Sequence, residues 1–202
     1  MGKTGTLLTW AYSMAKQYTA NDIRFLVFDF HKRSLGALEH LPQTLVYVGR
    51  RNMLEAGLRE LTSQVQQRRE HARREDSSKA DTRLPTLMVF IDDYYTFADE
   101  CSDDEKKQLW DGLLNSRDLG MSLAFSADVS EAMADYSDLL VKKVRAQGSG
   151  ILISPKEGND LYRYAKIPQI PMPLTFGPGR GWLIKRGQAR LIQVAMCKEV
   201  QS

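Results

Sequence analysis

Residues 86–93, TLMVFIDD, form the most apolar stretch that the sequence offers for a strand. The apolar run is nearly continuous rather than alternating, which is typical of a parallel strand covered on both faces. Two carboxylates, Asp92 and Asp93, end the run. Ligands of open α/β sheets bind at the carboxyl ends of such strands, so this pair marks a candidate site.

Strands and helices are predicted to alternate on both sides of this stretch. Apolar runs predict strands at 23–30, 44–48, 121–127 and 150–154. Apolar periodicity predicts helices at 4–18 and 50–74, and a further helix is expected through about 135–146. A capping box of Ser102 and Glu105 predicts the start of another helix. The pattern predicts an α/β fold: a mostly parallel sheet covered by helices on both faces, with a C-terminal β-hairpin turning at Gly187 and Gln188.

The composition is that of an ordinary globular protein. Hydrophobic residues make up 43% and charged residues 26%, and the net charge of +3 neither indicates nor forbids a nucleic-acid or membrane partner. Cys101 and Cys197 lack metal-ligand spacing, which favours a reducing compartment over a disulfide framework. No stretch approaches the ~20 apolar residues of a membrane span. We expect one cytoplasmic domain, 1–202, without direct membrane contact.

The triplet Gly2-Lys3-Thr4 stands at the start of the predicted helix at 4–18. It matches the end of the phosphate-binding motif G-x-x-x-x-G-K-[ST]. Glycine lets backbone N–H groups approach phosphate, the lysine ammonium meets the β- and γ-phosphates, and the threonine hydroxyl coordinates Mg²⁺. The earlier part of the motif lies outside the sequence, so we expect the domain to be truncated at its N-terminus within this loop.

The triplet and the aspartate pair together predict a site for ATP and Mg²⁺. Asp92 suits the Mg²⁺-associated carboxylate of such a site, with Thr4 as the second metal ligand. Each signal has an ordinary alternative. A three-residue match also occurs in an unremarkable N-terminal segment, and two aspartates also occur in a solvated turn after a strand.

Four segments resemble the FtsK/SpoIIIE/HerA branch of P-loop NTPases. They are IRFLVFDFHKRSLGAL (23–38), VFIDDYYTFAD (89–99), NSRDLGMSLAFSA (115–127) and FGPGRGWLIKRGQARLIQVA (176–195). The last is similar to the closing segment of the C-terminal ATPase module of EccC proteins from type VII (ESX) secretion systems. DNA-pumping FtsK proteins do not usually end that way, so this segment is the most specific. The resemblance spans nearly the whole chain and implies a RecA-like P-loop NTPase fold.

The resemblance also implies roles for single residues. Arg117 matches the arginine of the family's A-R-x-x-G segment, which can act as an arginine finger on a neighbouring module's nucleotide; the alternative is an ordinary helix-end arginine. Asp93 stands where active members carry a water-polarising glutamate. Ser126 matches the threonine of a Thr-Gln sensor pair, but Ala127 replaces the glutamine and cannot hydrogen-bond a γ-phosphate. We therefore expect weak or absent hydrolysis. The predicted catalytic residues are Asp93 and Arg117, and the predicted nucleotide-binding residues are Gly2, Lys3, Thr4, Asp92 and Ser126.

Two functional classes compete: a motor enzyme, and a docking module with a motor's fold but little turnover. Asp93 and Ala127 favour the second. The resemblance implies two kinds of partner, namely sister ATPase modules in the same chain or oligomer and the C-terminal tail of a secreted WXG100-type substrate. It also implies a membrane-anchored parent protein. The alternative is a DNA translocase of the FtsK/HerA type, although acidic residues interrupt the arginines of 68–76, which makes a DNA-binding patch there less favoured than a solvated helix end.

Overall fold

The computed structural model describes residues 2–30, 33–75, 83–114, 117–135, 137–153 and 176–195. Its contacts divide the chain into two compact units. The sheet unit is Trp10–Ser126, and the hairpin unit combines Met1–Thr9 with Ala127–Ser202. Helix α1 (Lys3–Gln17) begins in the hairpin unit, and its residues from Trp10 onward belong to the sheet unit. The expectation of one domain over 1–202 stays a prediction.

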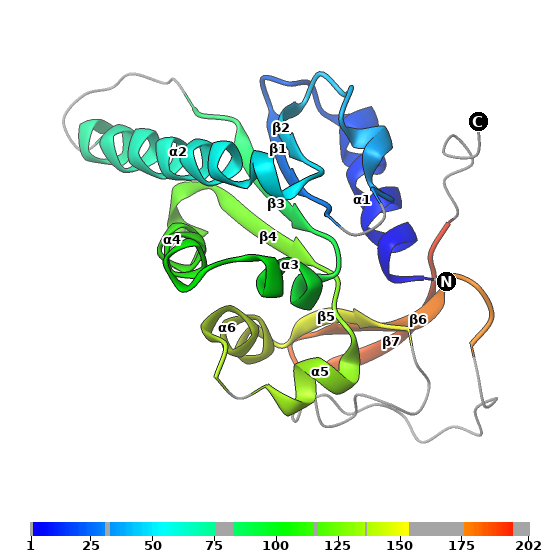
Figure 1. Cartoon of the computed structure of the whole chain (residues 1–202). Coiled ribbons are helices and arrows are strands. Elements are labelled where there is room, and N and C mark those ends of the chain that lie inside the picture. The colour runs from blue at the N-terminus through cyan, green and yellow to red at the C-terminus, as the bar shows by residue number, and fades with distance from the viewer. Residues whose placement is uncertain are drawn as a thin grey trace. The chain divides into compact units, whose positions relative to one another are not determined.

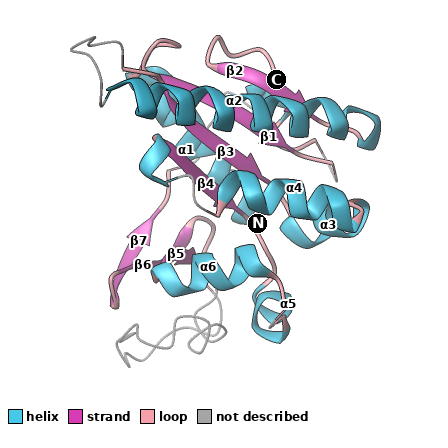
Figure 2. Cartoon of the chain, turned by 90° about the vertical axis from the view of Figure 1, so that its left-hand side faces the viewer, coloured by secondary structure: helices cyan, strands magenta, loops and turns pink. Residues whose placement is uncertain are grey.

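The sheet unit is built on four parallel strands in the order β2-β1-β3-β4 (Figure 2). Their bounds are β1 (Ile23–Phe28), β2 (Thr44–Val48), β3 (Thr86–Ile91) and β4 (Met121–Phe125). The predicted parallel sheet is confirmed. β1 and β4 each end two residues before the predicted limit, because Asp29 and Ser126 begin the polar segments that follow these strands.

Helices cover both faces of this sheet (Figure 1). Besides α1, the helices of the sheet unit are α2 (Leu54–Glu75), α3 (Tyr94–Glu100) and α4 (Asp103–Leu113). Its 3₁₀ turns are η1 (Gly36–Leu38), η2 (Arg51–Met53) and η3 (Arg117–Leu119). The capping box predicted at Ser102 and Glu105 opens α4. α4 packs closely on α2, since a β-carbon at Gly112 would come within 3.0 Å of the Leu61 side chain.

The core of the sheet unit lies around β1 and β3, whose apolar residues are almost all buried. Phe90 of β3 is its aromatic centre. The rings of Phe25 and Trp10 meet it edge to face, with centroids 5.6 and 6.2 Å away. Such pairs are favourable beyond the area that they bury. Trp10 thereby fixes α1 to the sheet on the face opposite α2 (Figure 1).

The hairpin unit contains an antiparallel sheet in the order β5-β6-β7. Its elements are α5 (Val129–Ala134), α6 (Leu139–Gln147), β5 (Ser149–Leu152), β6 (Arg180–Lys185) and β7 (Gln188–Gln193). The predicted C-terminal hairpin is confirmed, but its turn is at Arg186 and Gly187, one residue earlier than predicted. The helix expected at about 135–146 corresponds to α6, which begins at Leu139 after its cap Asp138; α5, capped by Asp128, was not predicted.

In the part of the chain that the structure describes, no helix is both long enough and apolar enough to cross a membrane.

Arg68 is a buried cation of α2 that joins two loops of the sheet unit. Its guanidinium donates hydrogen bonds to the carbonyl oxygens of Pro85 (2.6 Å), just before β3, and of Leu119 (3.2 Å), just before β4. Burial lowers the pKa of Arg68. One side chain thus links two carbonyls that are far apart in the chain.

We expect Arg68→Met to lower the free energy of unfolding by about 2–3 kcal/mol, because it leaves two partly buried carbonyl oxygens without this donor. Urea denaturation measures the change. Arg69→Met is the matched control, since Arg69 is exposed on the same helix and a surface change of this kind stays within about 0.5 kcal/mol. Equal stabilities of the two variants would contradict the role given to Arg68.

Candidate functional site

The carboxyl ends of three neighbouring strands place three polar residues in a row. β1 ends at Phe28, β3 at Ile91 and β4 at Phe125, and the register pairs Phe28 with Ile91 and Ile91 with Phe125. The next residue of each strand is therefore in line with the others. We call Asp29, Asp92 and Ser126 the edge row; all three are buried. Parallel strands present such a row at the edge where ligands bind.

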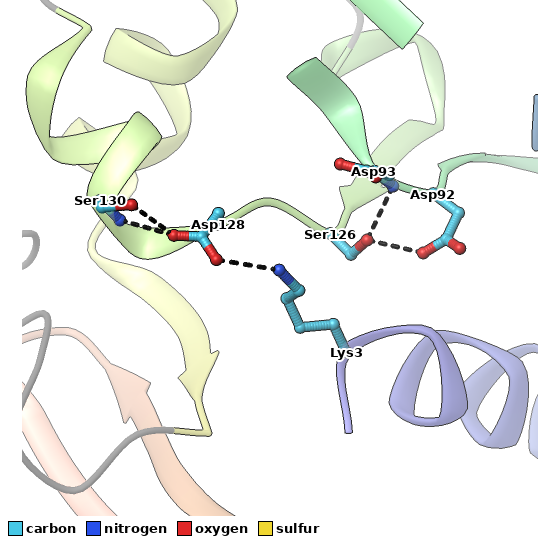
Figure 3. A network of polar contacts seen from close by, with 6 residues as sticks. All are labelled: Lys3, Asp92, Asp93, Ser126, Asp128 and Ser130. Carbon is cyan, nitrogen blue, oxygen red and sulfur yellow. Dashed lines mark hydrogen bonds and ion pairs between the residues drawn. The ribbon is translucent and has the colours of Figure 1, made fainter. Parts of the chain in front are cut away.

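Ser126 contacts both predicted aspartates, the carboxylate of Asp92 and the backbone of Asp93 (Figure 3). Its Oγ donates to Oδ1 of Asp92 at 2.6 Å and accepts from the backbone N–H of Asp93 at 2.8 Å. A hydroxyl has one proton, and here that proton is given to a carboxylate. The structure thus joins Asp92, Asp93 and Ser126, and the serine fixes the orientation of the Asp92 carboxylate.

The backbone of Asp93 is left-handed, with φ 51° and ψ 69°. Asp93 precedes α3, and its side chain makes no capping hydrogen bond. Aspartate and asparagine are enriched several-fold among non-glycine residues with positive φ, because their short polar side chains tolerate it. The position that the sequence assigns to a water-polarising carboxylate therefore has a conformation that favours aspartate over glutamate.

Asp29 is the member of the edge row that sequence reasoning missed as a site residue. Its Oδ2 accepts hydrogen bonds from the Leu35 amide (2.6 Å) and the Tyr47 hydroxyl (2.8 Å). Its Oδ1 is buried and accepts no hydrogen bond within the described part of the chain. Arg33 lies over the Tyr47 ring, 5.6 Å from its centroid, and pairs with Glu39 at 2.8 Å. An aspartate directly after an apolar strand was the available signal.

Burial is the main cause of the pKa shifts of Asp29 and Tyr47. It raises the pKa of Asp29, and the negative charge of Asp92 raises it further, although the hydrogen bonds from Tyr47 and Leu35 act in the opposite direction. Burial also raises the pKa of Tyr47, and its hydrogen bond to Asp29 adds to that rise. Tyr47 is therefore a neutral donor, while ionisation of Asp29 costs free energy in the folded state.

The triplet Gly2-Lys3-Thr4, predicted to bind phosphate, lies in the hairpin unit, and Lys3 and Thr4 are the first residues of α1. A β-carbon on Gly2 would lie 2.7 Å from Cγ2 of Ile153, so a side chain there would require Ile153 to move. The Nζ atom of Lys3 is 3.4 Å from Oδ2 of Asp128 (Figure 3). Hydrogen bonds from Ser130 and the charge of Lys3 lower the pKa of Asp128, so this carboxylate stays ionised.

The triplet and the edge row thus belong to different units. Gly2, Lys3 and Thr4 are in the hairpin unit, and Asp92, Asp93 and Ser126 are in the sheet unit. Sequence reasoning missed Asp128 as the partner of Lys3, since the two are 125 residues apart. The predicted pairing of Lys3 with Asp92 around one nucleotide stays a prediction.

Arg117 lies at the opposite end of the strands from the edge row, just before β4 begins. It begins η3, which leads through Gly120 into β4, whereas Ser126 follows the last residue of β4. Five residues of strand span about 16 Å, at roughly 3.3 Å per residue. The backbone of Arg117 is therefore remote from the edge row of its own sheet. The Arg117 side chain lies outside the described structure, and its role as a finger stays a prediction.

Among the described residues, no group of three or more His, Cys, Asp and Glu side chains could hold a metal ion. The Mg²⁺ ligands predicted from the sequence, Asp92 and the Thr4 hydroxyl, belong to different units and stay a prediction. Mg²⁺ commonly keeps several waters and takes one or two carboxylates together with substrate phosphates.

Comparisons with known proteins bear on this fold. No family model matches the chain. A curated relative, the ESX secretion system protein EccC of Geobacillus thermodenitrificans, is 23% identical over 96% of this chain, which spans 13% of that protein's length. The solved structure of ATPases 2 and 3 of EssC from the same organism has a TM-score of 0.75 at 23% identity, covering 96% of this chain and 37% of that one.

A second solved structure is ATPases 2 and 3 of EccC from Thermomonospora curvata, in complex with a signal sequence peptide. Its TM-score is 0.71 at 22% identity, over 98% of this chain and 35% of that one. The sheet, its flanking helices and the antiparallel hairpin are thus the α/β fold of an ATPase module. The resemblance predicted from the motifs is confirmed: this chain is similar to the ATPase modules of the type VII secretion proteins EccC and EssC.

The raised pKa of Asp29 gives a stability prediction with a defined sign. The folded state binds the Asp29 proton more tightly than the unfolded state, whose pKa is about 3.9. The contribution of Asp29 to the free energy of unfolding therefore falls as the pH rises from about 4 through the folded pKa. In Asp29→Asn this fall should be missing, which urea denaturation at a series of pH values would measure.

The difference between the wild-type and variant curves isolates Asp29 from carboxylates such as Asp128, whose lowered pKa makes stability rise with pH. Asp111→Asn is the control, because Asp111 is exposed on α4. Superimposable pH dependence in the wild type and Asp29→Asn would show that Asp29 titrates alike in both states.

Proposed function

We propose that this chain is a nucleotide-binding ATPase module of the EccC type, similar to the C-terminal module of those proteins, which docks a secreted WXG100-type substrate or a neighbouring ATPase module. The observation that carries the proposal is the buried Asp92, hydrogen-bonded by Ser126 at the carboxyl end of β3, in a chain with the fold of EccC modules. The module works in the cytoplasm as part of a membrane-anchored protein.

ATP and Mg²⁺ are the proposed cofactors. Gly2 and Lys3 hold the phosphates through backbone N–H groups and the lysine ammonium, and Thr4 with Asp92 holds the metal ion. Lys3 has to leave Asp128 to reach a phosphate. The present contact is 3.4 Å long between two half-exposed side chains, and an exposed ion pair of this kind is worth only about 0–1 kcal/mol. Lys3 can therefore exchange the Asp128 carboxylate for a phosphate at little cost in free energy.

Ser126 acts in this proposal through Asp92. Its one proton is donated to Oδ1 of that carboxylate, so it keeps a magnesium-associated group in one orientation. Ala127 offers no side-chain donor beside it. The site thus keeps the groups that bind a nucleotide and lacks one that senses the γ-phosphate.

Turnover is proposed to be slow. The Asp93 carboxylate is one methylene shorter than glutamate, and a misplacement of about 1 Å can cost ~100-fold in rate. The bond from the Asp93 amide to Ser126 also ties this residue to the edge row. If Arg117 acts as an arginine finger, it acts on the nucleotide of another module, because the Arg117 backbone lies at the amino end of β4, away from the edge row.

We expect a fluorescent ATP analogue to bind the protein in the presence of Mg²⁺. Lys3→Ala should abolish binding, because it removes the cation that meets the β- and γ-phosphates, and Asp92→Asn should remove the Mg²⁺ dependence. Fluorescence anisotropy measures both, with Lys107→Ala, an exposed lysine of α4, as the control. Binding that is equal in all four proteins, or rapid multiple-turnover hydrolysis abolished by Lys3→Ala, would contradict this account.

The proposed partner gives a second test, based on salt. The signal sequence peptide bound to Thermomonospora curvata EccC supports a peptide partner. We expect the C-terminal tail of a WXG100-type protein to bind with little loss of affinity at high salt, because burial of apolar surface is hardly screened. Duplex DNA binding would fall steeply with salt. Titrations with both ligands at low and high salt distinguish them, and tight, salt-sensitive DNA binding without peptide binding would replace this proposal with a DNA translocase.

A further inference from the structure

The described part of the closing segment, residues 176–195, carries positive charge only. It contains no aspartate or glutamate, and its four cations are exposed: Arg180, Lys185, Arg186 and Arg190. None of them forms an ion pair with another described residue. The whole chain has a net charge of only +3, so this cluster is a local feature of the β6–β7 hairpin.

The hairpin has two faces with different chemistry. On the inner face, Trp182 and Ile184 pack with Leu152 in a small core. Residues alternate along a strand, so Leu183 and Lys185 occupy the outer face. Arg190 of β7 lies directly opposite Leu183 in the register. Leu183 is 36% exposed, with the two cations beside it and Ile151 of β5 directly opposite it on the other side.

The turn adds a third cation at some cost in backbone strain. Arg186 and Gly187 both have positive φ, 52° and 78°, and Lys185 pairs with Gln188 around them. A two-residue turn of this type favours asparagine, aspartate or glycine at its first position. Arginine at a left-handed position is unfavourable. The arginine is therefore poorly explained by the needs of the turn itself, and a role for its side chain explains it.

We infer that the outer face of the β6–β7 hairpin docks an acidic segment of another protein, in which an apolar side chain contacts Leu183 and flanking carboxylates pair with the cations around it. Specific protein interfaces have this arrangement of an apolar centre and a polar rim. A nucleic acid fits less well, because its phosphate backbone offers nothing to an exposed leucine and its interfaces are larger and more uniformly cationic. No residue of the proposed nucleotide site takes part.

The test is a titration without nucleotide, followed by fluorescence anisotropy. The probe is a short labelled peptide with one leucine flanked on each side by glutamates, compared with the same peptide carrying glutamine for glutamate, the same peptide carrying serine for leucine, and labelled duplex DNA. We expect the first peptide to bind most tightly, with an affinity that falls as salt is raised. Equal binding of the glutamine peptide, or preferential binding of DNA, would overturn the inference.

Two variants separate docking from folding. Arg190→Glu should weaken peptide binding about tenfold, since it replaces one exposed ion pair with a repulsion. Arg186→Asn should weaken binding about fivefold and at the same time raise Tm by about 2–4 °C, because asparagine relieves the left-handed strain. Opposite signs for affinity and stability exclude a merely structural effect. Unchanged affinity in both variants would refute the docking surface.

Lys107→Glu is the control, because it reverses one exposed charge of the sheet unit at no hairpin position. Lys3→Ala should bind the peptide like the wild type, so a failure of the nucleotide-site proposal leaves this result unchanged. The tail-peptide titration is also distinct, since that binding is expected to resist salt and this one to be sensitive to it.

Discussion

The site depends on the register of three parallel strands. Phe28, Ile91 and Phe125 are paired across β1, β3 and β4, so the residues after them arrive at one edge together. Both faces of these strands are covered, so a slip of one residue would exchange the side chains that each face buries and would also break the row of Asp29, Asp92 and Ser126. The three residues are thus aligned by the pairing and packing of the strands before them. Their own hydrogen bonds then orient the side chains within the row.

Two neighbouring carboxylates at this edge are held in different ways. Asp92 receives a hydroxyl proton from Ser126, whereas Asp29 is turned toward Leu35 and Tyr47. The charge of Asp92 contributes to the raised pKa of Asp29, so the second aspartate is linked electrostatically to the first. A change that neutralises Asp92 would therefore remove one cause of the raised pKa of Asp29.

The parts of the fold that sequence predicted correctly are those that one local pattern determines. Apolar runs located the four parallel strands, and the Ser102 capping box marked the start of α4. The hairpin turn was predicted one residue too late, because glycine suits either turn position. The helix α5 was missed because it is only six residues long. Contacts such as those of Lys3 with Asp128 and of Arg68 with two carbonyls depend on residues far apart in the chain, and no local pattern encodes them.

The left-handed backbone of Asp93 connects the fold to the proposed slow turnover. A glutamate at this position would reach one methylene further, but it would also have to adopt a conformation that long side chains rarely take. That conformation is part of the chain path from β3 into α3, and the Asp93 amide is bonded to Ser126. The shorter carboxylate and the backbone are therefore adapted to one another. In the proposed module, nucleotide binding uses Lys3 and Asp92 and does not involve the Asp93 side chain. Rapid hydrolysis would require both a longer side chain at position 93 and a different backbone conformation there.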